Sequence, residues 1–259
     1  SITSWQDALK AISEHIGNER LILVIDNYSD ACLTNKELSS IIAEAIGNYF
    51  LGSRLFIVLC CGQMPAFERE VLDEKSPLCK YVTCRLNLKG LSFDEAETFM
   101  SGFSAKDRQR LYNCIGGTPL YLSMLDSKKT ADENIADLFL KSDGFLYNDI
   151  AMALQKELVG PAVYNSILRA IAYGNHKSKE ILNETGEERG KVHKYLNVLI
   201  AMNVLYREVP EGEDPAISRR GMYYFTDNAH RFWYRYVLDN RDFIARGYDP
   251  YRIEGWQTE

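Results

Sequence analysis

Two uninterrupted apolar runs, each ending in polar residues, constrain the fold of the first part of this chain more than any other feature. Leu21–Ile25 ends at Asp26-Asn27, and Leu55–Cys61 ends at Gly62-Gln63. Runs of this length that are polar only at their carboxyl ends are typical of central parallel strands. An amphipathic helix is expected between them, at Leu38–Phe50. The two runs and this helix predict a βαβ unit, and therefore an α/β fold with a parallel sheet.

Other segments extend this prediction on both sides. Ser4 is a suitable N-cap for a helix over Trp5–Ile16, and the alternating pattern of Tyr81–Leu86 predicts a third, shorter strand. Ser92-Phe93-Asp94-Glu95 forms a capping box that opens a helix through Met100. Further helices are expected at Ala105–Cys114, Leu120–Leu125, two stretches up to Leu158, Ala162–Tyr173, Ser178–Glu184 and Glu187–Met202, followed by strands at Val204–Val209 and Met222–Thr226. Three helices followed by a two-stranded hairpin are the element order of a winged helix-turn-helix.

Composition narrows the class of protein. The 259 residues are 46% hydrophobic and 25% charged, with a net charge of −6, which fits a globular chain that is not coated for nucleic acid. All six cysteines fall between Cys32 and Cys114 without zinc-ligand spacing, so free thiols in a reducing compartment are expected. No apolar run approaches the roughly 20 residues of a membrane span. We therefore expect a soluble, cytoplasmic protein that does not contact a membrane.

The ends of the two apolar runs are where chemistry is expected. In open α/β sheets, ligands bind at the carboxyl ends of the strands. An acidic residue that ends an aliphatic strand, as Asp26 does, is the arrangement with which a P-loop ATPase holds a Mg²⁺-bound water, although many strands end in Asp because of the following turn. The phosphate-binding loop G-x-x-x-x-G-K-S/T does not occur in the sequence. The segment Gly186–Val192 is one residue short, lacks the hydroxyl residue and follows a helix, so we interpret it as a helix-turn-helix turn.

Several motifs stand in an order that resembles a known family. They are Leu21–Asp26, Phe56–Gly62, Gly116–Leu122, Arg219–Asp227 and Arg231–Tyr236. Together they resemble the archaeal-type ATPases, a branch of the AAA+/STAND group of P-loop ATPases, over about residues 4–240. The resemblance implies a partial P-loop-type α/β core at 1–90, an all-α lid at 91–160, a winged helix-turn-helix domain at 161–236 and the start of a C-terminal region at 237–259.

The resemblance also implies roles for individual residues, with ATP and Mg²⁺ as cofactors. Asp26 matches the aspartate that coordinates Mg²⁺ through water. Asn27 stands where the family usually has the glutamate that activates the attacking water, and since an amide cannot accept a proton, the prediction leaves hydrolysis open. Gln63 or Gly62 occupies the position of the γ-phosphate sensor. Pro119 matches the proline of a lid motif near adenine, but a proline that opens a helix after two glycines explains it equally well.

The missing phosphate-binding loop leads to two interpretations. The chain is either a portion of a longer ATPase or a degenerate homologue that binds no nucleotide. We favour the portion, for which Mg-ATP is the partner of the intact protein and the 259 residues alone are expected to be inactive. The loop supplies most of the hydrogen bonds to the phosphates, so its absence should weaken binding strongly.

A second hypothesis comes from another class, that of winged-helix DNA-binding regulators with a non-catalytic α/β scaffold. The recognition helix would begin at Glu188 and present Arg189, Lys191 and Lys194, and the wing would carry Arg219 and Arg220. Residues 161–236 hold 11 basic and nine acidic side chains, which is a weak excess. A winged helix that serves only as a packing module is the simpler alternative.

A third hypothesis, a protein-interaction module, depends on the aromatic segment Arg231–Tyr236. Its spacing predicts a helix docked on the wing. An interaction module would instead leave Phe232 and Trp233 exposed on a surface.

Overall fold

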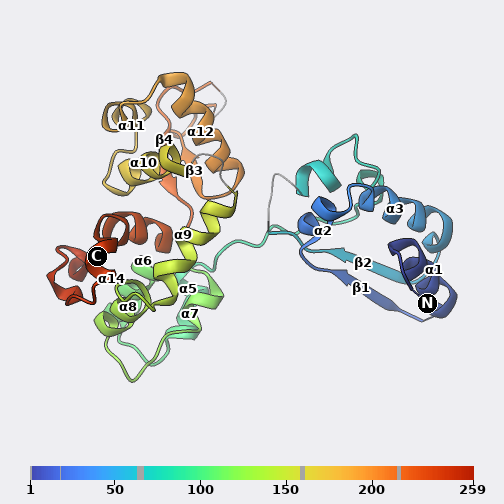
Figure 1. Cartoon of the computed structure of the whole chain (residues 1–259), viewed down its shortest axis with the longest axis horizontal. Coiled ribbons are helices and arrows are strands. Elements are labelled where there is room, and N and C mark those ends of the chain that lie inside the picture. The colour runs from blue at the N-terminus through green and yellow to red at the C-terminus, as the bar shows by residue number, and fades with distance from the viewer. Residues whose placement is uncertain (1, 18, 63–66, 158–160, 215–216) are drawn as a thin grey trace. The chain divides into compact units, whose positions relative to one another are not determined.

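The computed structural model describes residues 2–17, 19–62, 67–157, 161–214 and 217–259. These residues divide into two compact units, Ser1–Asn87 and Leu88–Glu259 (Figure 1). Each unit has a hydrophobic core of its own. Each is therefore described by itself.

The N-terminal unit is built on a parallel pair of strands. Strands β1 (Leu21–Ile25) and β2 (Leu55–Leu59) pair with Leu21 opposite Leu55 and Ile25 opposite Leu59, as the βαβ prediction requires. Figure 1 shows the strands side by side, with helices of the connecting segment on one side of them. The remaining elements of the unit are α1 (Trp5–Ile16), α2 (Tyr28–Thr34), α3 (Leu38–Ala45), its π-helical continuation Ile46–Phe50, a π-helical turn Glu68–Leu72 and a 3₁₀ turn Cys79–Tyr81. The helix predicted at Leu38–Phe50 is thus confirmed, and the Ser4 side chain accepts the Asp7 N–H at the start of α1 as expected.

The two faces of this small sheet differ in burial. Leu23, Ile25 and Ile57 point into the core formed with α1, α2 and α3. On the other face Val24 and Phe56 are 56% and 54% exposed, and no described element covers them. The interpretation of both runs as fully buried strands is therefore wrong for one face. The aliphatic sequence is that of a strand with two covered faces, whereas the described residues supply a helical layer for one.

The third strand predicted at Tyr81–Leu86 is not formed. Cys79–Tyr81 makes a 3₁₀ turn, and residues 82–86 after it belong to no strand. Leu86 is 82% exposed. An alternating pattern specifies a strand only where a sheet edge accepts its hydrogen bonds and a covering layer accepts its apolar side chains. Within the described part of the N-terminal unit, the sheet joins β1 and β2 alone.

The C-terminal unit is mostly helical. The capping box at Ser92 is confirmed, because its side chain accepts the Glu95 N–H and the Glu95 carboxylate accepts the Ser92 N–H at 2.8 Å. The elements are α5 (Phe93–Ala96) with its 3₁₀ continuation Glu97–Met100, α6 (Ala105–Ile115), α7 (Pro119–Leu122), α8 (Ala131–Phe139), α9 (Phe145–Glu157), α10 (Pro161–Ala172), α11 (Ser178–Thr185), α12 (Arg189–Ala201), β3 (Leu205–Glu208), β4 (Met222–Phe225), α13 (Asn228–Phe232), a π-helical turn Trp233–Val237, a 3₁₀ turn Leu238–Asn240, α14 (Arg241–Ala245) and 3₁₀ turns Pro250–Arg252 and Trp256–Thr258.

One continuous core joins these elements from α5 to the last turn. It includes residues of α6, α8, α10 and α12, the hairpin β3–β4 and the buried Trp256. Strands β3 and β4 are antiparallel, with Leu205 opposite Phe225. The described part of the chain contains no helix long and apolar enough to cross a membrane.

The aromatic segment after β4 lies in this core. Phe232 and Trp233 are 0% and 2% exposed, so the exposed pair on which the interaction-module hypothesis depends is not present. The segment is helical, as predicted, and α13 packs mainly against α6 and also contacts β4. Large aromatic side chains bury more apolar area than any others, which explains why this segment lies inside the unit.

Candidate functional site

The carboxyl ends of β1 and β2 lie next to each other. The Cys60 N–H donates to the Ile25 carbonyl at 2.9 Å, and the Tyr28 N–H donates to the Cys60 carbonyl at 2.8 Å. Asp26 therefore follows β1 directly beside the end of β2. It is exposed, and its Oδ1 accepts the Asn27 N–H at 2.8 Å. One carboxylate that faces water at this edge can hold a hydrated cation through its other oxygen.

The turn after Asp26 is anchored by a buried side chain. Asn27 adopts a left-handed backbone conformation with φ of 48°, which asparagine tolerates better than most residues. Tyr28 is completely buried, and its hydroxyl lies 2.7 Å from Ser39 Oγ. Burial raises the pKa of Tyr28 well above its usual value, so the hydroxyl stays protonated. The buried Tyr28 side chain therefore fixes the position of the backbone at Asp26 and Asn27.

The other residues predicted at this edge contribute less. Gly62 is exposed after β2, and Gln63 lies outside the described residues. No cluster of three or more His, Cys, Asp or Glu side chains in the described ranges could hold a metal ion. Of the residues predicted at this edge, the structure places Asp26 and Asn27 directly after β1, beside Cys60 at the end of β2, and Asp26 is the carboxylate among them.

Pro119 lies in the C-terminal unit, not in the unit that carries Asp26. It is the first residue of α7, directly after the N-cap Thr118. Gly116 ends α6 with φ of 77°. Pro119 therefore opens a helix shortly after a glycine C-cap, as the structural explanation of this proline requires.

The contacts that hold the loop Gly116–Thr118 were not predicted from the sequence. Thr118 Oγ1 donates to Asp227 Oδ2 at 2.7 Å, and the Leu91 N–H donates to the Gly117 carbonyl at 2.8 Å. Asp227 is also the N-cap of α13, since its Oδ1 accepts the Ala229 N–H at 2.7 Å. Asp227 before a helical aromatic segment is a readable capping signal, but its partner Thr118 lies 109 residues away.

The five basic residues considered for DNA lie on α12 and in the loop between β3 and β4. Arg189, Lys191 and Lys194 are exposed on α12, and Arg219 and Arg220 are exposed in the loop. On the other face of α12, Val192, Leu196 and Leu199 are buried. Two of the cations have carboxylate partners within the chain, because Lys191 pairs with Glu187 at 2.7 Å and Arg220 pairs with Glu213.

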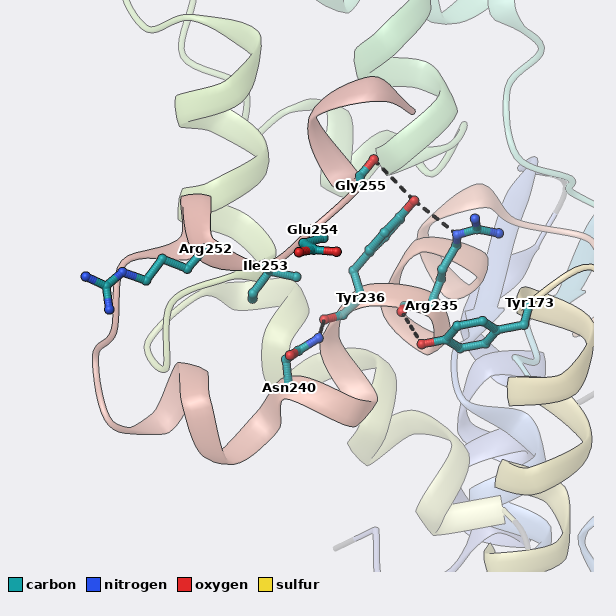
Figure 2. A pocket seen from close by; sticks show the side chains of 8 residues that line it. All are labelled: Tyr173, Arg235, Tyr236, Asn240, Arg252, Ile253, Glu254 and Gly255. Carbon is teal, nitrogen blue, oxygen red and sulfur yellow. Dashed lines mark hydrogen bonds between the residues drawn. The ribbon is translucent and has the colours of Figure 1, made fainter.

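A pocket of about 450 Å³ lies near the end of the C-terminal unit. It is lined by Tyr173, Arg235, Tyr236, Asn240, Arg252, Ile253, Glu254 and Gly255 (Figure 2). Of these, Arg235 and Tyr236 belong to the aromatic segment Arg231–Tyr236, and the sequence pattern predicted no site at the other six. The Tyr236 hydroxyl accepts from Arg235 Nε at 3.0 Å and donates to the Glu259 carboxylate at 2.6 Å. The Arg252 guanidinium is directed away from Tyr236 in Figure 2. Tyr236 thus connects two wall residues, Arg235 and the Gly255 carbonyl, to Glu259 near the end of the chain, and these contacts hold the last turns of the unit in place.

Comparison with known proteins gives one distant similarity. No protein-family profile matches the chain. The chain is 27% identical over 227 residues to the uncharacterized protein MJECL04 of Methanocaldococcus jannaschii, an alignment that covers 87% of this chain and 51% of that protein. The chain thus spans about half the length of this relative.

Proposed function

We propose that these residues form part of an AAA+/STAND-like P-loop ATPase of the archaeal type. The observation that carries the proposal is the exposed Asp26 at the paired carboxyl ends of β1 and β2. In the intact protein Asp26 would hold a Mg²⁺-bound water, and the bound Mg-ATP would supply the phosphoryl groups that the metal neutralises. The loop that cradles the phosphates would come from residues outside these 259.

The uncovered face of the small sheet supports this proposal. Val24 and Phe56 expose apolar side chains where a larger α/β core would provide a second layer. An isolated parallel pair of strands is also unusual, because parallel sheets normally have both faces covered. The distal part of a larger sheet would have these properties.

The arrangement of α10, α11, α12 and the hairpin supports a winged helix-turn-helix within the C-terminal unit. Gly186 ends α11 in a left-handed conformation and α12 begins at Arg189, so the turn between the two helices is short. Lys177, between α10 and α11, forms an antiparallel bridge with Met222 of β4. This bridge adds a short third strand segment to the hairpin, as a winged helix would have.

Equilibrium binding of Mg-ATP tests the ATPase proposal. The 259-residue chain alone should show no saturable binding at micromolar nucleotide, since it lacks the phosphate cradle. The intact protein should bind, and Asp26→Asn should weaken Mg²⁺-dependent binding about tenfold or more. The matched control is Asp30→Asn, which removes an exposed carboxylate from α2. Micromolar binding by the 259 residues, or equal effects of the two variants, would contradict the proposal.

The DNA-binding regulator is the second candidate. Exposed Arg189 and Lys194 on α12 favour it, whereas the intramolecular ion pairs of Lys191 and Arg220 reduce the charge available to phosphates. A duplex-DNA titration across salt concentrations tests it. A regulator should bind with a steep salt dependence that Arg189→Glu with Lys194→Glu abolishes. The charge-matched control is Lys106→Glu with Lys128→Glu, two exposed residues outside α12. Wild-type chain without salt-sensitive binding eliminates this candidate.

A further inference from the structure

The loop Gly116–Thr118 is held from two sides by segments distant in sequence. On one side the Leu91 N–H bonds to the Gly117 carbonyl, and the Tyr112 hydroxyl donates to the Leu91 carbonyl at 2.8 Å. On the other side Thr118 bonds to Asp227. The loop is therefore the junction between the segment that enters the C-terminal unit and the segment that follows β4.

The two glycines allow this close approach. A Cβ atom at Gly117 would overlap the backbone of Leu91, and one at Gly116 would overlap the Asp227 carboxylate. Neither neighbour is the free end of a flexible side chain, since Leu91 contributes backbone atoms and Asp227 is bonded through both carboxylate oxygens. The three segments therefore meet at this junction with no room for an added methyl group between them.

Asp227 performs two tasks with its two oxygens. Oδ2 accepts the Thr118 hydroxyl, and Oδ1 accepts the Ala229 N–H in the first turn of α13. The next residue strengthens the same connection, because Asn228 Nδ2 donates to the Tyr112 carbonyl at 3.1 Å near the end of α6. Any shift of Thr118 must therefore strain or release the start of α13.

We propose that Asp227 is a positioning residue that couples the Gly116–Pro119 loop to α13. A ligand that displaces the loop would change the stability of the first turn of α13, and by reciprocity a change at α13 would alter the loop. The inference rests on the proposed function only for the identity of that ligand, a nucleotide. The coupling itself exists in the chain without one.

Site-resolved amide hydrogen exchange on the 259-residue chain tests the coupling through two reporter amides. The Ala229 N–H bonds to Asp227 and not to Thr118, and the Leu91 N–H bonds to Gly117 and not to Asp227. Thr118→Val removes the hydroxyl and should raise exchange at Ala229 about tenfold, a typical effect of losing a hydrogen bond to a charged group. Asp227→Ser keeps an N-cap side chain for α13 but is too short to reach Thr118, and it should raise exchange at Leu91.

Two controls separate coupling from general destabilisation. Ser123→Ala removes an exposed hydroxyl that bonds to the Leu120 carbonyl in the same region and should leave both reporters unchanged. Thr118→Ser restores a hydroxyl and should return Ala229 to wild-type exchange. Amides of α12 report opening of the whole unit. Unchanged reporters in both test variants, or an equal rise in α12, would overturn the coupling. Binding of ATP by the intact protein is measured separately, so its absence there would remove the proposed function and leave the coupling intact.

Discussion

The Tyr28 hydroxyl and Ser39 Oγ lie 2.7 Å apart in the core of the N-terminal unit, where Tyr28 is completely buried and Ser39 is 5% exposed. This contact joins the first residue of α2 to α3. Because Tyr28 follows Asp26-Asn27 directly, the same contact fixes the turn that presents the candidate carboxylate. Removing one hydroxyl of such a buried pair lowers the stability, because the other hydroxyl stays buried without its partner.

Tyr28→Phe should therefore destabilise the N-terminal unit by about 1–2 kcal/mol, because Ser39 keeps a buried hydroxyl without this partner. The double variant Tyr28→Phe with Ser39→Ala should recover part of the loss. Exchange of α3 amides measures the opening free energy of this unit separately from that of the other. Tyr49→Phe, at a site that is 46% exposed, serves as the control. Equal effects at Tyr28 and Tyr49 would show that the buried contact contributes nothing.

Neighbouring residues of β1 provide a second prediction, because they face opposite sides of the sheet. Ile25 is 6% exposed in the core, whereas Val24 is 56% exposed. Ile25→Thr should cost about 2–4 kcal/mol, since it removes buried apolar volume and buries a hydroxyl. Val24→Thr should change the stability of the 259-residue chain by less than about 0.5 kcal/mol. Denaturant unfolding followed by α3 exchange tests both. A loss at Val24 as large as at Ile25 would mean that the exposed face is covered in solution.

Gly117 provides a third prediction, about the loop. Gly117→Ala should destabilise the C-terminal unit by about 2–4 kcal/mol, because the new methyl group displaces the Leu91 backbone and breaks its hydrogen bond. Gly190→Ala is the matched control in the same unit. Gly190 lies in α12 with open space around it, so alanine should stabilise the helix by about 0.5–1 kcal/mol. Urea unfolding measures both changes, and a tolerated Gly117→Ala would contradict the tight junction.

Most of the secondary structure could be predicted from local patterns in the sequence. The capping box at Ser92 and the turn at Gly186 depend on residues within a few positions of each other, and both are present in the fold. The strand predicted at Tyr81–Leu86 failed for the opposite reason. Strand formation depends on a partner edge, and that partner is not specified by the segment itself.

The residues of the candidate sites also differ in whether a local pattern predicts them. Asp26 could be predicted because the end of a parallel strand is a local feature with a known position in the sheet. The Thr118–Asp227 contact could not be predicted, because the residues around each of them do not indicate a partner 109 positions away. An N-cap carboxylate has a second oxygen, so the signal available was only that Asp227 could accept one more hydrogen bond.

His230, on α13, lies close to this contact and provides a prediction about pH. Burial lowers its pKa below the usual 6.5, while the nearby carboxylates of Asp227 and of Asp149 on α9 partly oppose that shift. Asp149 is itself held, because its Oδ2 accepts the Tyr121 hydroxyl at 2.8 Å. Burial dominates, so the folded chain favours the neutral imidazole.

The stability of the C-terminal unit should therefore fall as the pH decreases below about 6.5. The unfolded chain takes up a proton at His230 as the pH falls through 6.5, whereas the folded chain resists it until the lower folded pKa. The stability that the unit has with His230 neutral is fully present above pH 6.5 and decreases below it. The free energy of unfolding should change by at most about 1.4 kcal/mol per pH unit. Urea unfolding at several pH values should show this slope in wild type and a smaller one in His230→Gln, while His15→Gln, an exposed residue of α1, keeps it. A slope that survives in His230→Gln would assign the pH dependence to other groups, and a slope of opposite sign would mean that the carboxylates outweigh burial.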